Sequence, residues 1–288
     1  MDTKILNSFD SLSIGAIYTP EKWARFAIEK FNIFEAWISG KTVFDPTMGD
    51  GSLLCALVEY GLSRGYTPSR LPCRRLFGLE LNKEFHENAV SRFSSRYGID
   101  MRGNFYNADI FDFKGSAFDV LFGNPPWCNF VDLPKDYKEY LKPFFHTYGL
   151  VDNPKKLLLG GSRIDIAALV IQKTIADNLR ESGEAIFFLP LSLFLNDGAH
   201  TAFRKFKTQK DRYALYSLYD FENTHAFDKI ATRYGIAHFV KTSGKSGSIP
   251  FFRFEDDTWK EYKAVLPDIG KPYYIVHPEA QEIGRAHV

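Results

Sequence analysis

Short apolar runs alternate with helical segments along the first two thirds of the chain, and this alternation constrains the fold more than any other feature. The apolar runs are predicted strands, at 42–44, 76–79, 105–106, 118–122 and 185–189. The main segments between them are predicted helices, at 52–60, 83–97 and 164–179. Strands separated by helices of this length pair in parallel, because a parallel neighbour needs a long crossover connection. The sequence therefore predicts an α/β fold with a doubly wound, mostly parallel sheet.

The segments on either side of this region have patterns of their own. Apolar residues recur at helical spacing from Trp23 to Ile38, with Thr19 as the predicted N-cap, Pro20 as the first helical residue and Gly40 at the end. The last third contains three further predicted strands with hairpin-type connections, at 213–219, 234–240 and 250–254. We expect these strands to complete the sheet with an antiparallel edge.

Composition bounds the class of protein. A share of 45% hydrophobic and 25% charged residues is typical of a globular chain, and a net charge of +1 neither requires nor excludes a nucleic-acid partner. The cysteines are Cys55, Cys73 and Cys128, and the absence of a C-x-x-C pair argues against a disulfide framework or a zinc site. No apolar run approaches the roughly 20 residues of a membrane span. We therefore expect a cytoplasmic protein with no membrane partner.

Acidic residues follow three successive predicted strands. Asp45 begins Asp-Pro-Thr-Met-Gly-Asp-Gly (45–51), whose glycines let the backbone approach a ligand. Glu80 is placed to accept hydrogen bonds from both hydroxyls of a ribose, and Asp109 is placed to accept one from an exocyclic amine. Taken singly, each is equally explained by a tight turn or a solvated carboxylate. Together they lie where open sheets hold ligands, which favours a nucleoside-bearing cofactor.

Two other phosphate-binding patterns fit less well. Leu54 occupies the third glycine position of the G-x-G-x-x-G dinucleotide fingerprint, which is therefore incomplete. The Gly-Lys-Ser/Thr of a Walker loop is missing, and this excludes a P-loop.

The predicted strand at 118–122 ends in Gly-Asn-Pro-Pro-Trp (123–127). The side-chain oxygen of Asn124 and the carbonyl of Pro125 are acceptors that no following N–H draws into a ladder. Two acceptors aimed at one point suit an amine with two hydrogens, and they localise the lone pair of its nitrogen. Trp127 offers a stacking face for a planar substrate. In isolation the motif is equally a strand terminator, but its position after the three acidic residues favours an amine site.

In this order, Tyr-Thr-Pro (18–20), the 45–51 segment, Glu80, Asp109 and Asn-Pro-Pro-Trp (124–127) resemble the S-adenosylmethionine-dependent N6-adenine DNA methyltransferases of restriction-modification systems. The resemblance spans about residues 17–240. It implies a Rossmann-like class I methyltransferase fold with a terminal antiparallel hairpin, and no metal. The implied cofactor-binding residues are Tyr18, Thr19, Pro20, Asp45, Pro46, Met48, Gly49, Gly51, Glu80, Asp109 and Ile110, and the implied catalytic residues are Asn124, Pro125, Pro126 and Trp127.

The resemblance further implies that aromatic rings stack on a base flipped out of the duplex. We assign this role to Trp127 and Phe227, and a core side chain explains Phe227 nearly as well. Methyl transfer in this family is direct, so no covalent enzyme intermediate is expected. We interpret Cys128, next to the motif, as a packing residue.

The clearest basic run carries no assignment. Its members are Arg204, Lys205, Lys207, Lys210 and Arg212. A solvated helix face explains this run about as well as contact with phosphates does.

Residues 1–254 are the predicted catalytic domain, 255–281 the predicted start of a truncated target-recognition region, and 282–288 a predicted non-native tail. The expected partners are DNA and either a specificity subunit or a fused target-recognition region.

The same amine site would also suit an RNA guanine amine or a protein glutamine amide. A non-catalytic specificity module predicts decay of the acceptor or cofactor residues, none of which is missing. The sequence does not separate a stand-alone enzyme, a type I subunit and a fused restriction-modification protein.

Overall fold

Five parallel strands form one half of the sheet, as the alternation of strands and helices predicted. The computed structural model describes residues 19–115, 117–152, 163–208, 211–222, 224, 232–244 and 247–277. The parallel strands are β1 (Val43–Asp45), β2 (Leu76–Glu80), β3 (Phe105–Asn107), β4 (Phe118–Gly123) and β5 (Leu179–Pro190), and they lie in the order β5-β4-β1-β2-β3. The chain moves outward from β1 to β3 and then crosses back to β4. This reversal of direction creates a switch point between β1 and β4, where doubly wound sheets bind ligands.

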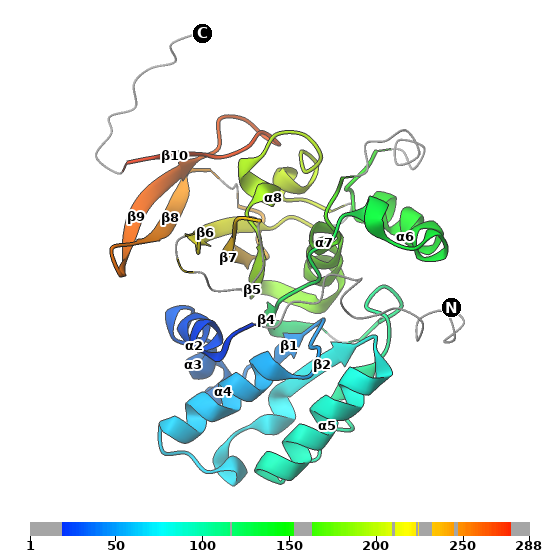
Figure 1. Ribbon diagram of the computed structural model, residues 1–288, viewed down its shortest axis with the longest axis vertical. Coiled ribbons are helices and arrows are strands. Elements are labelled where there is room, and N and C mark those ends of the chain that lie inside the picture. Colours follow the sequence, from blue (N-terminus) through cyan, green and yellow to red (C-terminus); the bar gives the residue numbers. More distant parts are fainter. Residues whose placement is uncertain are drawn as a thin grey trace.

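Helices cover both faces of this half of the sheet (Figure 1). One face carries α2 (Glu21–Lys30), α3 (Ile33–Ile38), α4 (Ser52–Ser63) and α5 (Lys83–Tyr97), and the other carries α6 (Lys135–Thr147), α7 (Ile166–Asn178) and α8 (Ser192–Leu195). The strands alternate between the two cores: on β4, Leu121 packs with α6 and α7, whereas Phe122 packs on the opposite side. Both faces are apolar because parallel strands are buried on both sides.

The antiparallel part of the sheet differs in detail from the prediction. Strand β7 (Tyr234–Val240) inserts between β5 and β6 (Ala214–Asp220) and is antiparallel to both, which gives the expected hairpin. Strand β8 (Ile249–Glu255) pairs with β6 in parallel and does not pair with β7. A hairpin-type connection from β7 to β8 was therefore a wrong expectation. Both edges of β7 are occupied, by β5 and by β6. The edge of β6 that does not face β7 is free, and β8 pairs there.

Two strands lie beyond the predicted catalytic domain boundary at residue 254. Strand β9 (Thr258–Val265) pairs with β8, and β10 (Tyr274–Val276) pairs with β9, so the sheet continues without a break to ten strands among the described residues (Figure 1). The start of 255–281 thus belongs to the same sheet as the parallel strands. The predicted tail at 282–288 lies outside the described residues.

The predicted N-terminal helix is two helices. Asn32 adopts a left-handed conformation with φ of 51°, and this separates α2 from α3. Asparagine tolerates this conformation better than most residues, because its short polar side chain can hydrogen-bond locally. Pro20, and not Thr19, occupies the N-cap position of α2, and it makes no side-chain capping bond. The side chain of Thr19 instead bonds Asn124, as described below.

The polar and aromatic insertion at 129–163 contains a helix that the sequence analysis did not predict. Its ends are brought together by a bridge between Asn129 and Asp165 and by the amide of Ile166, which donates to the carbonyl of Cys128 at 2.8 Å. Helix α6 projects from this closed excursion beside α7 (Figure 1). Among the described residues, no helix is both long and apolar enough to cross a bilayer.

Candidate active site

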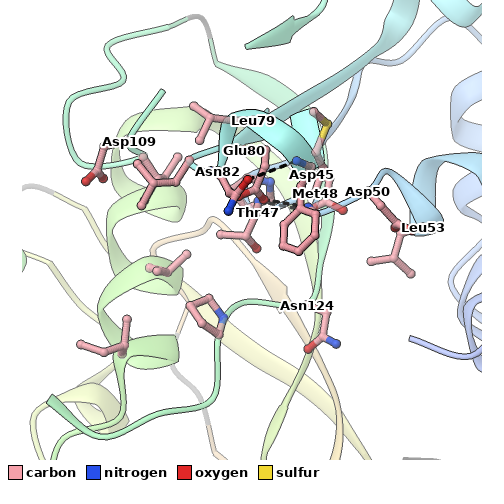
Figure 2. A pocket seen from close by; sticks show the side chains of 18 of the residues that line it. Asp45, Thr47, Met48, Asp50, Leu53, Leu79, Glu80, Asn82, Asp109 and Asn124 are labelled. Carbon is pink, nitrogen blue, oxygen red and sulfur yellow. Dashed lines mark hydrogen bonds between the residues drawn. The ribbon is translucent and has the colours of Figure 1, made fainter. Parts of the chain in front are cut away.

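A cavity opens at the carboxyl ends of β1, β2 and β4, at the switch point of the sheet. It encloses about 1200 Å³ of space, part of which is open solvent. The predicted site residues that line it are Thr19, Asp45, Pro46, Met48, Gly49, Glu80, Asp109, Ile110, Asn124 and Pro126. In Figure 2, Asp109 lies at one side of this space, Asp50 at the other, and Asn124 below Glu80 and Asp45. The fold thus brings residues from all five predicted motifs to one cavity.

Asp45 is the last residue of β1 and is 1% exposed. Its Oδ1 accepts a hydrogen bond from the amide of Thr47 at 3.1 Å. A Cβ atom at Gly123 in the neighbouring strand β4 would stand 3.0 Å from this oxygen, so a larger residue there would require the Asp45 side chain to shift. Burial raises the pKa of Asp45 to about 8, and the negative charge of Glu80 acts in the same direction. Binding of a cation or of a hydrogen-bond donor would therefore lower the pKa of Asp45 and favour its ionised form.

Met48 anchors the loop between β1 and α4. Its amide donates to the carbonyl of Leu79 at 2.9 Å, and its buried side chain occupies the space above Gly78, where a Cβ atom would come within 2.2 Å of Sδ. Gly49 and Gly51 follow with positive φ angles of 55° and 79°. A Cβ at Gly51 would meet Ala89 of α5 at 3.2 Å. Gly51 does not line the cavity, so its role in this structure is the close packing of α4 on α5.

Glu80 joins the first two loops at the base of the cavity. Its Oε2 accepts from the amide of Gly49 at 2.9 Å, and its Oε1 accepts from the amide of Asn82 at 2.7 Å (Figure 2). Asn82 also caps α5, because its side-chain oxygen accepts from the amides of Glu84 and Phe85. Burial raises the pKa of Glu80, whereas the two backbone hydrogen bonds oppose that shift. The carboxylate is held in one orientation, and each oxygen has a lone pair left for a ligand hydroxyl.

Asp109 forms the far end of the cavity. Its Oδ1 accepts from the amide of Phe111 at 2.9 Å, and its Oδ2 accepts a longer bond of 3.4 Å from the hydroxyl of Tyr137. Burial raises the pKa of Asp109 to about 6. Ile110, the next residue, is 5% exposed and contributes an apolar wall.

Asn124 directly follows β4 and reaches the cavity beside Thr19, whose Oγ1 accepts from Nδ2 at 3.1 Å. Pro126 also lines the cavity, whereas Pro125 is buried and does not belong to the lining. Trp127 lies outside the lining, and its ring stands 5.7 Å from that of Tyr234 at an interplanar angle of 31°. Pro20 is exposed and does not line the cavity, and its carbonyl accepts from the amides of Trp23 and Ala24 in the first turn of α2. The other two assigned residues, Tyr18 and Phe227, lie outside the described residues.

Part of the lining comes from residues that the sequence analysis did not assign. They include Thr47, Asn82, Phe85, Leu133, Tyr137 and Ile166. Thr47 and Asn82 adjoin assigned residues, so proximity in the chain could have suggested them. Leu133 and Tyr137 lie in the insertion, where aromatic and apolar residues recur at helical spacing from 137 to 148. That spacing predicts a helix but not its position over the cavity.

The charge of the cavity restricts what it can bind. Four carboxyl groups line it, those of Asp45, Asp50, Glu80 and Asp109, and no lysine, arginine or histidine does so among the described residues. Asp50 is paired outside the lining with Arg92, at 2.6 Å. A lining of carboxyl groups favours a ligand with a positive charge and several hydrogen-bond donors over a phosphate-bearing nucleotide.

Two sequence interpretations from outside the cavity are tested by burial. Burial raises the pKa of Cys128 to about 12, and its side chain packs against the hydrophobic core, in agreement with the packing interpretation. Arg204 is fully buried and donates to three backbone carbonyls, those of Leu193, Asn196 and Gly270. It is therefore neither on a solvated helix face nor available to phosphates, which corrects both interpretations of the basic run at this position.

The model of the Eco57I restriction-modification methylase family matches residues 75–227, more than half of the chain. The chain belongs to this family. The matched segment of the chain includes Glu80, Asp109 and the Asn-Pro-Pro-Trp motif. A curated relative, the modification methylase CviBIII of Paramecium bursaria Chlorella virus NC1A, is 25% identical over 179 residues, which are 62% of this chain and 38% of that protein. The chain thus spans well under half of the curated relative that it matches.

Solved structures share the fold of this chain. The modification subunit of a putative type I restriction enzyme from Vibrio vulnificus YJ016 superimposes with a TM-score of 0.55 and 17% identity, over 88% of this chain and 50% of that one. A DrdV–DNA complex gives a TM-score of 0.64 at 17% identity, over 90% and 31% of the two chains. The ATP-dependent type ISP enzyme LlaBIII bound to DNA gives 0.65 at 11% identity, over 90% and 22%. The fold is that of the class I methyltransferases, with a mostly parallel sheet and antiparallel strands toward the C-terminus.

Proposed function

We propose that this chain transfers a methyl group from S-adenosylmethionine to the N6 amine of adenine in DNA, as the catalytic part of a restriction-modification enzyme. The observation that carries the proposal is the single cavity that runs from Asp109 past Glu80 to Asn124, lined by carboxyl groups and by no described basic side chain. Because its substrate would be intracellular DNA, we place its action in the cytoplasm.

The residues of the cavity fit this cofactor. Its positive sulfonium and ammonium groups and its two ribose hydroxyls match a lining of carboxylates. The hydroxyl of Thr47 lines the cavity, is buried and makes no hydrogen bond with the described residues, so a ligand could satisfy it. We infer that the loop from Asp45 to Gly49 would hold the methionine part, Glu80 the ribose and Asp109 with Ile110 the adenine. S-adenosylmethionine would supply an electrophilic methyl group.

The chain's own contribution to chemistry would come from Asn124 and Pro125. Their oxygens would accept the two hydrogens of the target amine, which orients the nitrogen and localises its lone pair. The bond from Asn124 Nδ2 to Thr19 fixes the rotation of the amide, so that its oxygen is presented in a defined direction. A base in a duplex would have to leave the stack to reach these acceptors, and Trp127 would offer it a ring to stack on.

Recognition of a DNA sequence is a separate function, and we infer that it comes from a specificity subunit or a further region of a longer enzyme. The similar structures described above include a type I modification subunit and DNA-bound restriction-modification enzymes. They support DNA as the substrate class, with the whole enzyme as the unit that reads it.

The test uses radiolabelled S-adenosylmethionine with unmethylated bacterial DNA, ribosomal RNA and protein extract in parallel. The labelled DNA is digested to nucleosides, and we expect the label to elute as N6-methyldeoxyadenosine. Label in another nucleoside would refute adenine as the target, and label only in RNA or protein would refute DNA as the substrate.

Asn124→Ala separates catalysis from cofactor binding. We expect transfer to fall below detection, while the Kd for S-adenosylhomocysteine, measured by calorimetry, stays within about threefold of the unsubstituted chain. Asn129→Ala is the matched control, because Asn129 lies five residues along the chain, outside the cavity lining. If Asn124→Ala instead abolished cofactor binding, the division of roles between the motifs would be wrong.

A further inference from the structure

Helix α6, from the insertion, closes the end of the cavity that contains Asp109. Leu133 and Tyr137 line the cavity together with Ile166 and Val170 of α7, and both residues of the insertion are buried. The paired ends of the insertion hold α6 at the tip of β4, so that it lies over the edge of the sheet. The insertion therefore contributes a wall of the cavity.

A ladder of aromatic rings fixes α6 against the loop that carries Asp109. Tyr137 stacks on Tyr140 with ring centroids 5.8 Å apart, Phe144 contacts Tyr140 at 5.3 Å, and Phe144 stacks on Phe111 at 5.1 Å. Phe111 is also the residue whose amide bonds Asp109. Such ring contacts stabilise the packing beyond the area that they bury. The helix and the Asp109 loop therefore behave as one packed unit.

The carboxylate of Asp109 is held from two directions. The Phe111 amide binds Oδ1, and the Tyr137 hydroxyl reaches Oδ2. A single hydrogen bond would leave the carboxylate of Asp109 free to rotate about its Cβ–Cγ bond. The two bonds together fix the plane of the carboxylate. An amine that donates to an already oriented carboxylate loses less conformational freedom on binding.

We propose that Tyr137 is a positioning residue that orients Asp109 to recognise the exocyclic amine of the cofactor's adenine. This inference rests on the proposed use of S-adenosylmethionine. It assigns to the insertion a function in selecting adenosyl over other nucleosyl ligands.

Discrimination between two ligands tests the proposal. S-adenosylhomocysteine and S-inosylhomocysteine differ at position 6 of the base, where the second carries a carbonyl oxygen in place of the amine. We expect the intact chain to bind the adenosyl compound more tightly, and Tyr137→Phe to reduce the ratio of the two Kd values by about 3- to 10-fold, since the lost contact is a single long hydrogen bond. The phenylalanine ring keeps the aromatic ladder in place.

Tyr148→Phe is the matched control. Tyr148 is equally buried, follows the last residue of α6, and donates its own phenol bond to the carboxylate of Asp177 at 2.7 Å, away from the cavity. A general loosening of α6 would lower the ratio in both variants, whereas positioning of Asp109 would lower it only in Tyr137→Phe. An unchanged ratio in Tyr137→Phe, or an equal fall in both, would overturn the proposal.

A second measurement uses Asp109→Asn. If Tyr137 acts through the carboxylate, Tyr137→Phe has no further effect on the ratio of the two Kd values once Asp109 is replaced.

The pH dependence of binding gives an independent readout. Burial and the charge of Asp112 raise the pKa of Asp109, whereas the bonds from Phe111 and Tyr137 and the charge of Lys173 lower it. Tyr137→Phe should therefore move the loss of affinity to a higher pH.

The two proposals fail in different ways. If the unsubstituted chain bound neither homocysteine compound, the proposed function would fail and this inference with it. If it bound the adenosyl compound with preference and Tyr137→Phe kept that preference in full, only the role of Tyr137 would fail.

Discussion

Gly78→Ala tests how the first loop of the site is supported. Gly78 lies in β2, beneath Met48, and its missing side chain leaves the space that the methionine fills. An alanine Cβ would stand 2.2 Å from Met48 Sδ and 3.2 Å from Leu54 Cδ1. Because non-bonded atoms are most stable at about 3.5–4.0 Å, the sulfur would have to move by about 1.5 Å. Met48 lines the cavity, so its displacement should also narrow the space for a ligand.

Overpacking of a buried site destabilises a protein by about 1–3 kcal/mol, and we expect Gly78→Ala to fall in this range. The measurement is the free energy of unfolding from urea titration, together with the Kd for S-adenosylhomocysteine, which should rise. Met48→Ala alone removes a buried side chain and should destabilise by about 2–5 kcal/mol. In the double variant the added methyl group occupies part of the vacated space. The double variant should therefore be more stable than the sum of the single effects predicts, by about 1–3 kcal/mol.

Gly103→Ala is the control for the backbone effect of replacing glycine. A Cβ at Gly103 would have no atom within 4 Å, so this substitution should be neutral or stabilising by up to about 1 kcal/mol. The explanation would be refuted if Gly78→Ala were no more destabilising than Gly103→Ala. Strict additivity of Gly78→Ala and Met48→Ala would also refute it, since the two effects are argued to arise at one contact.

Two further predictions follow from burial. Burial raises the pKa of Asp109 to about 6, and protonation makes its carboxyl group a weaker acceptor, so affinity for S-adenosylhomocysteine should fall below pH 6, by at most about tenfold per pH unit. Calorimetric titrations from pH 5 to 8 measure this, and a component near pH 6 that persists in Asp109→Asn would contradict it. Arg204→Met should destabilise by about 3 kcal/mol or more, because three carbonyls lose their donor and the bonds to two of them, Leu193 and Gly270, are buried. The exposed control Lys207→Met should change the unfolding free energy by no more than about 0.5 kcal/mol, and equal effects of the two substitutions in urea titrations would count against this account.

The parallel half of the fold and four of its site residues were predictable from local sequence patterns. Helix α5 has the predicted bounds, and Asp45, Glu80, Asp109 and Asn124 line one cavity as the strand pattern suggested. These predictions succeed because hydrophobic periodicity reports local conformation, and because the carboxyl ends of parallel strands necessarily meet at one edge of the sheet.

Other features had no decisive local signal. The charge of Arg204 suggests a solvated residue, and only the carbonyls of Gly270 and of the segment around α8 explain its burial. The parallel pairing of β8 with β6 depends on which sheet edge was free, and a strand's own residues do not encode that choice.

The sequence by itself determined the class of fold, the order of the motifs and the acidic character of the candidate cofactor site, because each depends on residues close together in the chain. Tertiary structure alone decided that Gly51 packs helices together, that Trp127 lies beside Tyr234 outside the cavity lining, and that Tyr137 faces Asp109. The physical reason is that these contacts join residues distant in sequence. The geometry of these contacts depends on how whole helices pack on the sheet. The hydrophobic periodicity within one segment does not predict that packing.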